Sequence, residues 1–205
     1  MKGVLITFEG SEGSGKSTQA RLLLQYLKAR GKDVMFIREP GGVKISEVIR
    51  KVLLDVHNDI MTKECETLLY MAARSQLVYE VIAPALKAGR IVISDRFLDS
   101  TVAYQGYGNG VDIKFIKQLG RFVTDGIKPD LTFIMDLSTV TGLSRTGKNK
   151  DRIEQRAASY HQRVRKGYLA IARQEPNRVK VIDARGSRME IQEKIRGFVD
   201  KGFKI

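Results

Sequence analysis

The sequence predicts an α/β fold in which a five-stranded parallel sheet carries helices on both faces. Five short apolar segments alternate with stretches of helical periodicity along the 205 residues. The first, third and fourth segments are nearly continuous apolar runs, as expected of parallel strands covered on both sides. Polar residues follow most of these segments directly, and open parallel sheets bind ligands at that carboxyl edge.

The elements can be assigned in order along the chain. A helix with Leu23 and Leu27 on one side follows the first strand and ends near Gly31. The longest helical pattern runs from about residue 62 to 88, with a bend or break expected near Pro84. Because the chain has no repeat, low-complexity tract or linker, we expect residues 1–205 to form a single domain. The expected strands are residues 4–8, 34–37, 91–93, 131–135 and 179–182.

The composition is that of an ordinary globular protein, with 42% hydrophobic and 29% charged residues. The first apolar run stops at Glu9, so we expect neither a signal peptide nor a membrane span there. Cys65 is the only cysteine, which excludes an intrachain disulfide and a cysteine-based zinc site and favours a cytoplasmic location. His57 and His161 are isolated in the sequence, and we interpret both as surface or packing residues.

The charge is more unusual, because the chain carries a net charge of +13. Residues 141–180 contain eleven basic and three acidic residues. This excess fits a nucleic-acid footprint, a solvated helix face or the surroundings of a polyphosphate site. The segment has only two aromatic residues, Tyr160 and Tyr168, and no base-stacking motif, so we expect no nucleic-acid partner.

Residues 10–17 form a complete G-x-x-x-x-G-K-[ST] motif between the first strand and the first helix. In this setting the backbone N–H groups of the loop form an anion cradle at a helix N-terminus. Lys16 would reach the β- and γ-phosphates of a nucleotide, and the Ser17 hydroxyl would bind Mg²⁺. The sequence therefore predicts a binding site for a nucleoside triphosphate.

Charged residues stand at the carboxyl ends of the other strands. Asp95 follows an apolar strand and is the expected carboxylate on the metal side. Asp136 is the competing candidate, but we expect it to cap the helix that begins near Ser138. Arg38 and Arg96 also end strands, where they are candidates for phosphate binding or for surface ion pairs.

Longer motifs make the chain resemble the bacterial thymidylate kinases, which are nucleoside monophosphate kinases with a P-loop. The motifs are the phosphate loop with Glu12 inside it, R-E-P-G-G at 38–42, L-L-Y-M-A-A-R at 68–74, D-R at 95–96, S-T-V-A-Y-Q-G at 100–106, D-R-I-E at 151–154, R-V-R-K-G-Y at 163–168 and V-I-D-A at 181–184. The resemblance implies a P-loop NTPase-type fold with a short mobile lid at about residues 143–153, and a homodimer. It also implies phosphoryl transfer from Mg²⁺-ATP to dTMP, giving dTDP and ADP for dTTP synthesis.

A nucleoside monophosphate needs no general base, because its second ionisation lies near pH 6. Catalysis should therefore rest on cations and alignment. The motif and the resemblance together give the catalytic candidates Lys16, Asp95, Arg96, Arg145 and Arg152, and the Mg²⁺ ligands Ser17 and Asp95. The expected ATP-binding residues are Gly10, Ser11, Glu12, Gly13, Ser14, Gly15, Lys16, Ser17, Thr18, Arg145, Asp183, Ala184 and Arg185. The expected dTMP-binding residues are Glu12, Arg38, Pro40, Tyr70, Arg74, Arg96, Ser100, Thr101, Tyr104 and Gln105.

The resemblance also gives individual roles at the dTMP site. Tyr70 would stack on thymine, and Arg74 would donate to thymine O4, where cytosine carries an amino group instead. Pro40 would lie by the 5-methyl group, and Tyr104 would fill the space of a ribose 2′-hydroxyl. Glu12 would contact the sugar 3′-hydroxyl.

The lid departs from the usual pattern of the family. Members carry an arginine in the phosphate loop or in the lid, and here the loop position is Gly13, so the lid should supply the cation. Arg152 is the first candidate because its motif is better preserved, Arg145 is the second, and Lys148 is the third. Val43 stands where the family often has threonine.

The apolar surface of residues 62–88 and the resemblance favour a dimer that packs helices together. The residues that carry this prediction are Leu68, Leu69, Leu77, Val78 and Val81, and core packing within one chain is the alternative. Two other functions stay open: a P-loop kinase for another substrate, and a basic P-loop ATPase on nucleic acid. The first should lack the joint presence of Tyr70, Arg74 and Tyr104.

Overall fold

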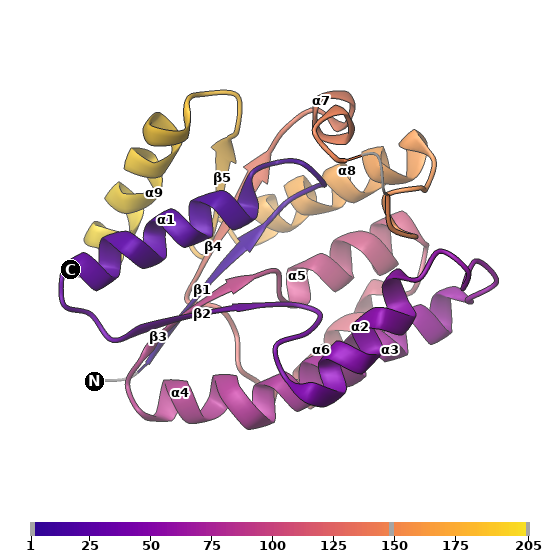
Figure 1. The fold of residues 1–205 in the computed structure, drawn as a ribbon, viewed down its shortest axis with the longest axis horizontal. Coiled ribbons are helices and arrows are strands. Elements are labelled where there is room, and N and C mark those ends of the chain that lie inside the picture. Colours follow the sequence, from indigo (N-terminus) through magenta and orange to yellow (C-terminus); the bar gives the residue numbers. More distant parts are fainter. Residues whose placement is uncertain (1–2, 148–149, 204–205) are drawn as a thin grey trace.

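The computed structural model describes residues 3–147 and 150–203, and it confirms the α/β fold (Figure 1). Five parallel strands form one sheet in the order β2-β3-β1-β4-β5. Each strand extends one or two residues beyond its predicted end and so includes the polar residue that follows the apolar run. The strands are β1 (Val4–Glu9), β2 (Val34–Arg38), β3 (Ile91–Asp95), β4 (Leu131–Asp136) and β5 (Val179–Asp183).

Helices cover both faces of the sheet, as predicted. Two helices lie on one face: α1 (Lys16–Ala29) and α9 (Arg188–Phe203). The segments that pack on the other face are α3 (Lys63–Leu77), η1 (Val78–Ile82), α4 (Ala83–Lys87), α5 (Leu98–Thr101), η2 (Val102–Gly108) and α8 (Ala158–Gln174). The remaining helices are α2 (Lys44–Leu54), which packs on α3, α6 (Ile113–Val123), which packs on α3 and η2, and α7 (Thr139–Ser144), which packs on α8.

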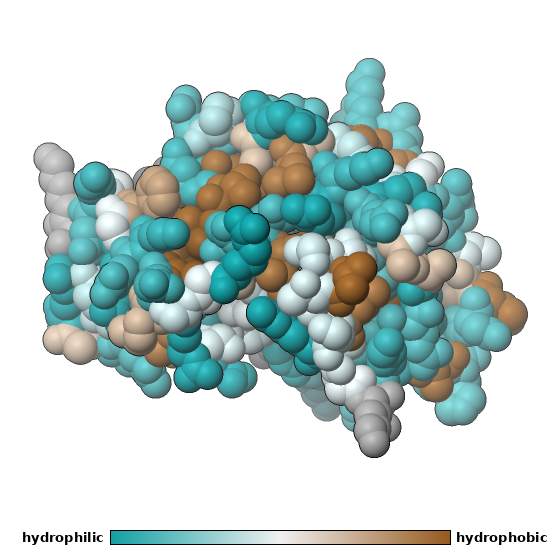
Figure 2. All heavy atoms as spheres, turned by 90° about the horizontal axis from the view of Figure 1, so that it is seen from above, coloured by the Kyte–Doolittle hydropathy of each residue, from teal (hydrophilic) through white to brown (hydrophobic). Residues whose placement is uncertain are grey.

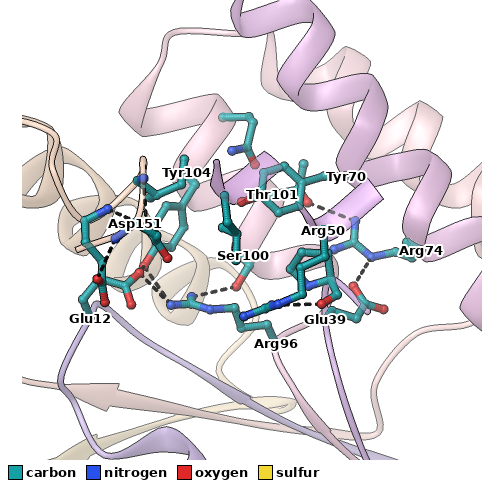
Figure 3. A pocket seen from close by; sticks show the side chains of 15 residues that line it. Glu12, Glu39, Arg50, Tyr70, Arg74, Arg96, Ser100, Thr101, Tyr104 and Asp151 are labelled. Atoms are coloured by element: carbon teal, nitrogen blue, oxygen red, sulfur yellow. Dashed lines mark hydrogen bonds and ion pairs between the residues drawn. The ribbon is translucent and has the colours of Figure 1, made fainter. Parts of the chain in front are cut away.

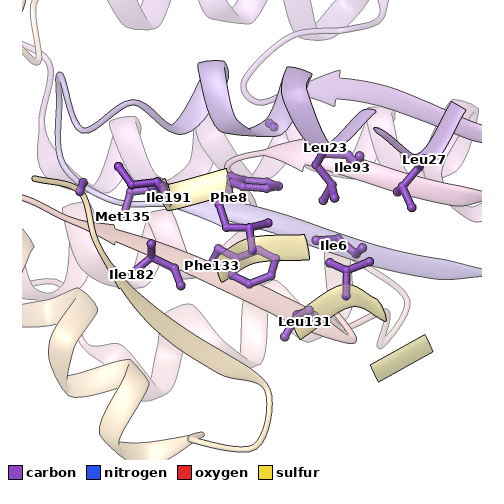
Figure 4. Packing of buried hydrophobic residues seen from close by; sticks show 14 of the residues in the cluster. Ile6, Phe8, Leu23, Leu27, Ile93, Leu131, Phe133, Met135, Ile182 and Ile191 are labelled. Carbon is purple, nitrogen blue, oxygen red and sulfur yellow. The ribbon is translucent and has the colours of Figure 1, made fainter. Parts of the chain in front are cut away.

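Successive side chains of β1 point to opposite faces of the sheet, so this strand contributes to the hydrophobic core on each face. Ile6 and Phe8 point toward α1 and α9, where the rings of Phe8 and Phe133 lie with their centroids 5.3 Å apart (Figure 4). Leu5 points to the opposite face and packs with Leu77 and Val92. Because every one of these side chains is fully buried or nearly so, the sheet is a rigid base for the loops at its carboxyl edge.

Of the predicted segment 62–88, residues 63–87 are helical and Thr62 is the N-cap, but the hydrogen-bonding pattern changes along the segment. A π-helical turn, η1, joins α3 to α4 directly before Pro84, and the residues that flank it keep right-handed helical angles. Pro84 is the second residue of α4, so its ring and its missing N–H fall where the π-helical turn ends and the hydrogen-bonding pattern changes. The expected discontinuity near Pro84 is therefore a change of helix type and not a break.

Charged and polar residues dominate the outer surface. Figure 2 shows a largely hydrophilic face on which hydrophobic residues occupy a few separate areas. Within residues 3–147 and 150–203, no helix is long and apolar enough to cross a membrane. The isolated histidines behave as expected: His57 is exposed beside Asp55, and His161 is buried against Tyr160.

Much of the basic excess of residues 141–180 is paired within the chain. Arg152 and Arg156 both bind Glu66, and Arg165 binds Asp136 at 2.7 Å. Arg178 binds Asp99 at 2.7 Å. These pairs join α8 and its flanking loops to other elements, so this charge is used to hold the fold together.

Candidate active site

The phosphate-binding loop connects β1 to α1, and glycine is required at two of its positions. Gly10 has φ 137° and Gly13 has φ 65°, in the region that side chains disfavour. A Cβ atom on Gly10 would lie 2.6 Å from the carbonyl oxygen of Met135. A Cβ atom on Gly13 would lie 2.0 Å from the carbonyl oxygen of Gly142 in α7. The close approach of α7 leaves no room for an arginine side chain at position 13.

Lys16 and Ser17 begin α1 and face into the loop. The Lys16 ammonium group donates to the carbonyl oxygen of Ser11 at 2.8 Å. Burial and the nearby charge of Arg96 lower the pKa of Lys16 to about 8, against the attraction of Glu12 and Asp95. An added phosphate would oppose this lowering and keep the ammonium group charged.

The structure brings Ser17 and Asp95 together, and the Ser17 hydroxyl donates to the Asp95 carboxylate. Among the described residues no three His, Cys, Asp or Glu side chains gather as a metal site. Two protein oxygens beside a phosphate loop fit Mg²⁺, which takes its other ligands from substrate phosphates and water. A cation that needs a full protein cage would not fit here.

Arg96 is the centre of the site. It directly follows β3, has φ 75°, and lies over the Tyr104 ring at 4.9 Å. Its Nη1 donates to Gly10, Ser100 and Tyr168, and its Nη2 donates to Glu12 at 2.8 Å and to Tyr104 at 3.0 Å. The guanidinium group is thus fixed beside the phosphate loop before any substrate binds.

Glu12 is held in the ionised form by this arrangement. Burial alone would raise its pKa, but the charges of Arg96 and Lys16 and the hydroxyl of Tyr104 lower the pKa to about 2. Tyr104 donates to Glu12 at 2.5 Å. The Glu12 side chain therefore keeps acceptor oxygens at the mouth of the neighbouring cavity.

That cavity has a volume of about 210 Å³ and lies at the carboxyl ends of β2 and β3 (Figure 3). It brings together every residue predicted for dTMP binding except Arg38. The residues that line it are Glu12, Glu39, Pro40, Arg50, Leu54, Tyr70, Arg74, Arg96, Ser100, Thr101, Tyr104, Gln105, Asp151, Ile153 and Glu154.

Arg74 is built into the wall of the cavity. Only 2% of its surface is exposed, and it forms an ion pair with Glu39 at 2.8 Å. It also donates to Thr101 and to the carbonyl oxygen of Phe97, at 2.9 Å each. These partners hold its guanidinium group in one orientation, so that the cavity is shaped before a ligand arrives.

Arg38 and Arg50 differ from expectation. Arg38 does not line the cavity; it pairs with Glu47 at 3.0 Å and donates to the carbonyl oxygen of Pro40 at 3.2 Å. Arg50, which lies one helical turn after Glu47 on α2, lines the cavity and donates to the carbonyl oxygen of Pro40 at 2.9 Å. Sequence reasoning missed Arg50, because no motif marks it and its place at the cavity depends on how α2 packs on α3.

The lid arginines lie in different surroundings. Arg152 is buried, donates to the carbonyl oxygen of Leu53 at 2.8 Å and pairs with Glu66 at 2.7 Å. Glu66 also accepts from Arg156 and, at 3.0 Å, from Gln105. In this conformation Arg152 anchors the end of the lid. This position does not support the prediction that Arg152 is the first candidate for the cation that contacts the transferring phosphoryl group. Lys148 lies outside the described residues.

Arg145 lines a second cavity of about 180 Å³ on the other side of the phosphate loop. Of the predicted ATP-binding residues beyond the loop, this cavity includes Thr18, Arg145 and Ala184. Asp183 and Arg185 instead form an exposed pair at 2.6 Å, and the hydrogen bonds from Arg185 lower the Asp183 pKa to about 2. The lining residues are Ser14, Gly15, Thr18, Gln19, Met135, Arg145, Ala184, Gly186, Arg188 and Ile191, of which Arg188 was missed.

The predicted cap of α7 by Asp136 is wrong. Ser138 caps the helix itself, since its hydroxyl accepts from the Thr141 backbone N–H at 3.2 Å. Asp136 receives two hydrogen bonds from Arg165, at 2.7 and 2.9 Å. The partner on α8 lies too far along the chain for a local pattern to reveal it.

A phosphate loop thus lies between two cavities, with a lysine and an arginine fixed beside it and an oxygen pair suited to Mg²⁺. This fold and this site define a P-loop phosphotransferase. The comparisons with known proteins give the family within that class. Residues 8–195 match the family model described as thymidylate kinase. The chain belongs to the thymidylate kinase family.

Relatives agree over nearly the whole chain. It is 49% identical to the thymidylate kinase of Symbiobacterium thermophilum over 199 residues, which is 97% of this chain and 93% of the relative. It is 48% identical to that of Halothermothrix orenii, over 95% of both chains. The crystal structure of thymidylate kinase from Ehrlichia chaffeensis matches with a TM-score of 0.80 and 34% identity, over 97% of this chain and 99% of that one.

Proposed function

We infer that this chain phosphorylates dTMP to dTDP with ATP, the reaction of the thymidylate kinase family, and that transfer takes place beside Arg96. One observation carries the assignment of sites: the phosphate loop lines both cavities, through Glu12 on one side and Ser14 and Gly15 on the other. We assign the Arg96 side to dTMP and the Arg145 side to ATP. The two phosphate groups would then meet over the loop.

The proposed mechanism is in-line transfer with cationic stabilisation and no general base. The dTMP phosphate is largely ionised at neutral pH, so the main obstacles are anion repulsion and alignment. Lys16 and Arg96 place two positive charges where negative charge spreads in the transition state. Mg²⁺, held on the Ser17 and Asp95 oxygens, would neutralise part of the charge of the ATP phosphates.

Recognition of thymine is assigned to the wall of the dTMP cavity. Tyr70 offers an aromatic face for stacking, and Arg74 offers N–H groups to O4 from a fixed position. Pro40 lies on the same wall, where we place the 5-methyl group. Tyr104 and Glu12 are hydrogen-bonded to each other, and we place them at the deoxyribose.

Arg145 is our proposed lid cation, and Arg152 is proposed as an anchor. Arg145 lines the ATP-side cavity together with Gly15 and Thr18, so a short movement of the lid would bring it to the phosphates. Arg152 would have to leave a buried carboxylate to do the same. For Arg38 to bind dTMP, as the sequence predicts, its ion pair with Glu47 would first have to break.

The test is release of ADP by the purified protein with Mg²⁺-ATP and one nucleotide at a time. The panel is dTMP, dUMP, dCMP, UMP and dGMP, with DNA and RNA as controls. We expect turnover with dTMP and a smaller rate with dUMP. Phosphate release stimulated by DNA and not by dTMP would favour an ATPase on nucleic acid. A preference for another monophosphate would favour a different kinase.

We also propose a homodimer and a cytoplasmic location. The apolar set predicted for the dimer is partly core, because Leu77 is fully buried and Val78 is 4% exposed, while Leu68 is 53% exposed. A better face runs along α2, where Ile45, Val48 and Val52 are 51%, 57% and 41% exposed at spacings of three and four residues. Since α2 packs on α3, these side chains and Leu68 can contribute to one helical interface.

A further inference from the structure

Glu9 is a buried carboxylate that none of the assignments above uses. It is the last residue of β1, adjoins the phosphate loop and has no exposed surface. Its Oε1 accepts from the Phe97 backbone N–H at 2.8 Å. Its Oε2 accepts from the Ser100 hydroxyl at 2.5 Å and from the Tyr168 hydroxyl at 3.0 Å. Three donors therefore converge on one carboxylate beneath the active site.

The same two hydroxyl oxygens accept from Arg96. Its Nη1 donates to Ser100 at 3.2 Å, a contact drawn in Figure 3, and to Tyr168 at 3.1 Å. Each hydroxyl has one hydrogen, and an ionised Glu9 can only accept. The Ser100 and Tyr168 oxygens are 2.8 Å apart, but whichever of them donates to the other, no hydroxyl hydrogen has to point at Arg96.

We propose that Glu9 is a positioning residue for phosphoryl transfer, which orients the Ser100 and Tyr168 hydroxyls so that their lone pairs hold the Arg96 guanidinium group beside the reacting phosphates. Because an arginine can only donate, both contacts form only if each hydroxyl hydrogen points away from Arg96. A protonated Glu9 would donate to one of the two hydroxyls, and the hydrogen of that hydroxyl would then point at the other hydroxyl oxygen, where it competes with Arg96, or at the guanidinium group itself.

The charged surroundings make this arrangement sensitive to pH. Burial and the negative charge of Asp99 on α5 raise the pKa of Glu9 to about 7, while Arg96 opposes the rise. Lys16 on α1 also attracts the carboxylate. Asp99 itself is paired with Arg178, and burial keeps the Tyr168 and Tyr104 hydroxyls neutral by raising their pKa values well above the usual range.

The sign of the pH effect follows from the raised pKa. Above about pH 7 Glu9 is ionised and only accepts, so Arg96 is held; below that pH the protonated form increases and kcat should fall. The dTMP phosphate is protonated from the dianion to the monoanion near pH 6, which gives a second, more acidic limb. Two ionisations should therefore shape the acid side of the kcat profile of the parent enzyme.

The decisive variant is Glu9→Gln, which keeps the shape of the side chain but gives it an N–H₂ group that must donate. Displacement of Arg96 should lower kcat at pH 8 by about 10- to 100-fold. The KM for ATP should change by less than about threefold, because Lys16 and the loop are untouched. The limb near pH 7 should disappear and the limb near pH 6 should remain. An unchanged kcat, or a limb that stays near pH 7, would overturn the proposal.

A double-mutant cycle with Tyr168→Phe separates positioning from a general loss of structure. Tyr168→Phe removes one of the two hydroxyls that link Glu9 to Arg96 and leaves the Ser100 hydroxyl in place. If Glu9 acts through that hydroxyl, Glu9→Gln should cost clearly less in the Tyr168→Phe background than in the parent enzyme. If the fold reductions in kcat caused by the two substitutions simply multiply, Glu9 and Tyr168 act independently, which would contradict positioning through Tyr168.

Asp99→Asn offers a test that leaves Glu9 in place, should Glu9→Gln fail to fold. Asp99 contacts neither cavity that we assign to a substrate. Removal of its charge should lower the pKa of Glu9, so the acid limb of kcat should move to lower pH while kcat at pH 8 stays within about threefold. A limb that does not move would show that it belongs to another group and would overturn the proposal.

Discussion

The cavity that we propose for dTMP and the cavity that we propose for ATP are lined in different ways. Around the first, charged lining side chains are already paired: Arg74 with Glu39, and Arg96 with Glu12. Around the second, much of the lining is backbone and small side chains such as Gly15 and Ala184. On the proposed assignment, the dTMP site is organised before the substrate binds, whereas the ATP site takes part of its charge from Arg145 at the start of the lid.

The lid arginines provide the strongest test of this difference. Arg145→Ala should lower kcat by about 10³-fold, the lower end for loss of a cation on a transferring phosphoryl group, and change the KM for dTMP little. Arg152→Ala should instead lower stability by about 3–5 kcal/mol, because it leaves Glu66 buried with less compensation. Steady-state kinetics and thermal unfolding of both variants decide between them. If both keep kcat within about threefold, the lid is only a cover.

Gly13 provides the next test, because here the phosphate loop lies against Gly142 in α7, the helix that precedes the lid. Gly13→Ala introduces a Cβ atom where only 2.0 Å separates it from the Gly142 carbonyl oxygen. Displacement of the loop by about 1 Å should cost about 10²-fold in kcat/KM for ATP. The affinity for dTMP, measured by calorimetry without ATP, should change far less. An equal loss at both sites would mean that the two cavities are not organised independently.

The preference among nucleoside monophosphates tests the cavity that we propose for dTMP, where the charged side chains are already paired. With Arg74 fixed as a donor, dCMP should have a kcat/KM about 10²-fold below that of dTMP, because its amino group faces N–H groups. Loss of the 5-methyl group in dUMP should cost about 10-fold. Equal values for dTMP and dCMP would remove the role assigned to Arg74. Equal values for dUMP and UMP would do the same for Tyr104.

The dimer has the smallest expected effect on chemistry. Val48→Glu places a charge on the exposed stripe of α2 and should give a monomer by light scattering at micromolar concentration. We expect kcat to stay within about threefold, because the lining residues of both cavities belong to one chain. Val181→Glu is the matched control, because Val181 is also an exposed valine, at 45%, and lies on the edge strand β5 at the far side of the sheet from β2. A parent protein that is already monomeric would contradict the proposal.

The parts of the site that the sequence predicted depend on local order. Strand ends, the phosphate loop and the Ser17–Asp95 pair follow from apolar runs and from the shared edge of parallel strands. The parts it did not predict depend on partners far along the chain. Arg152 meets Glu66, 86 positions away, and the choice between Arg38 and Arg50 depends on how α2 docks on α3.

The contact between Gly13 and Gly142 also bears on how sequences of this family can change. Each of the two positions denies the other a side chain, since a Cβ on Gly142 would lie 2.4 Å from the Glu12 carbonyl oxygen. An arginine could enter the loop at position 13 only if α7 moved away or changed its path. Members that carry the loop arginine should therefore differ at the helix before the lid as well, and the two positions should be inherited as a pair.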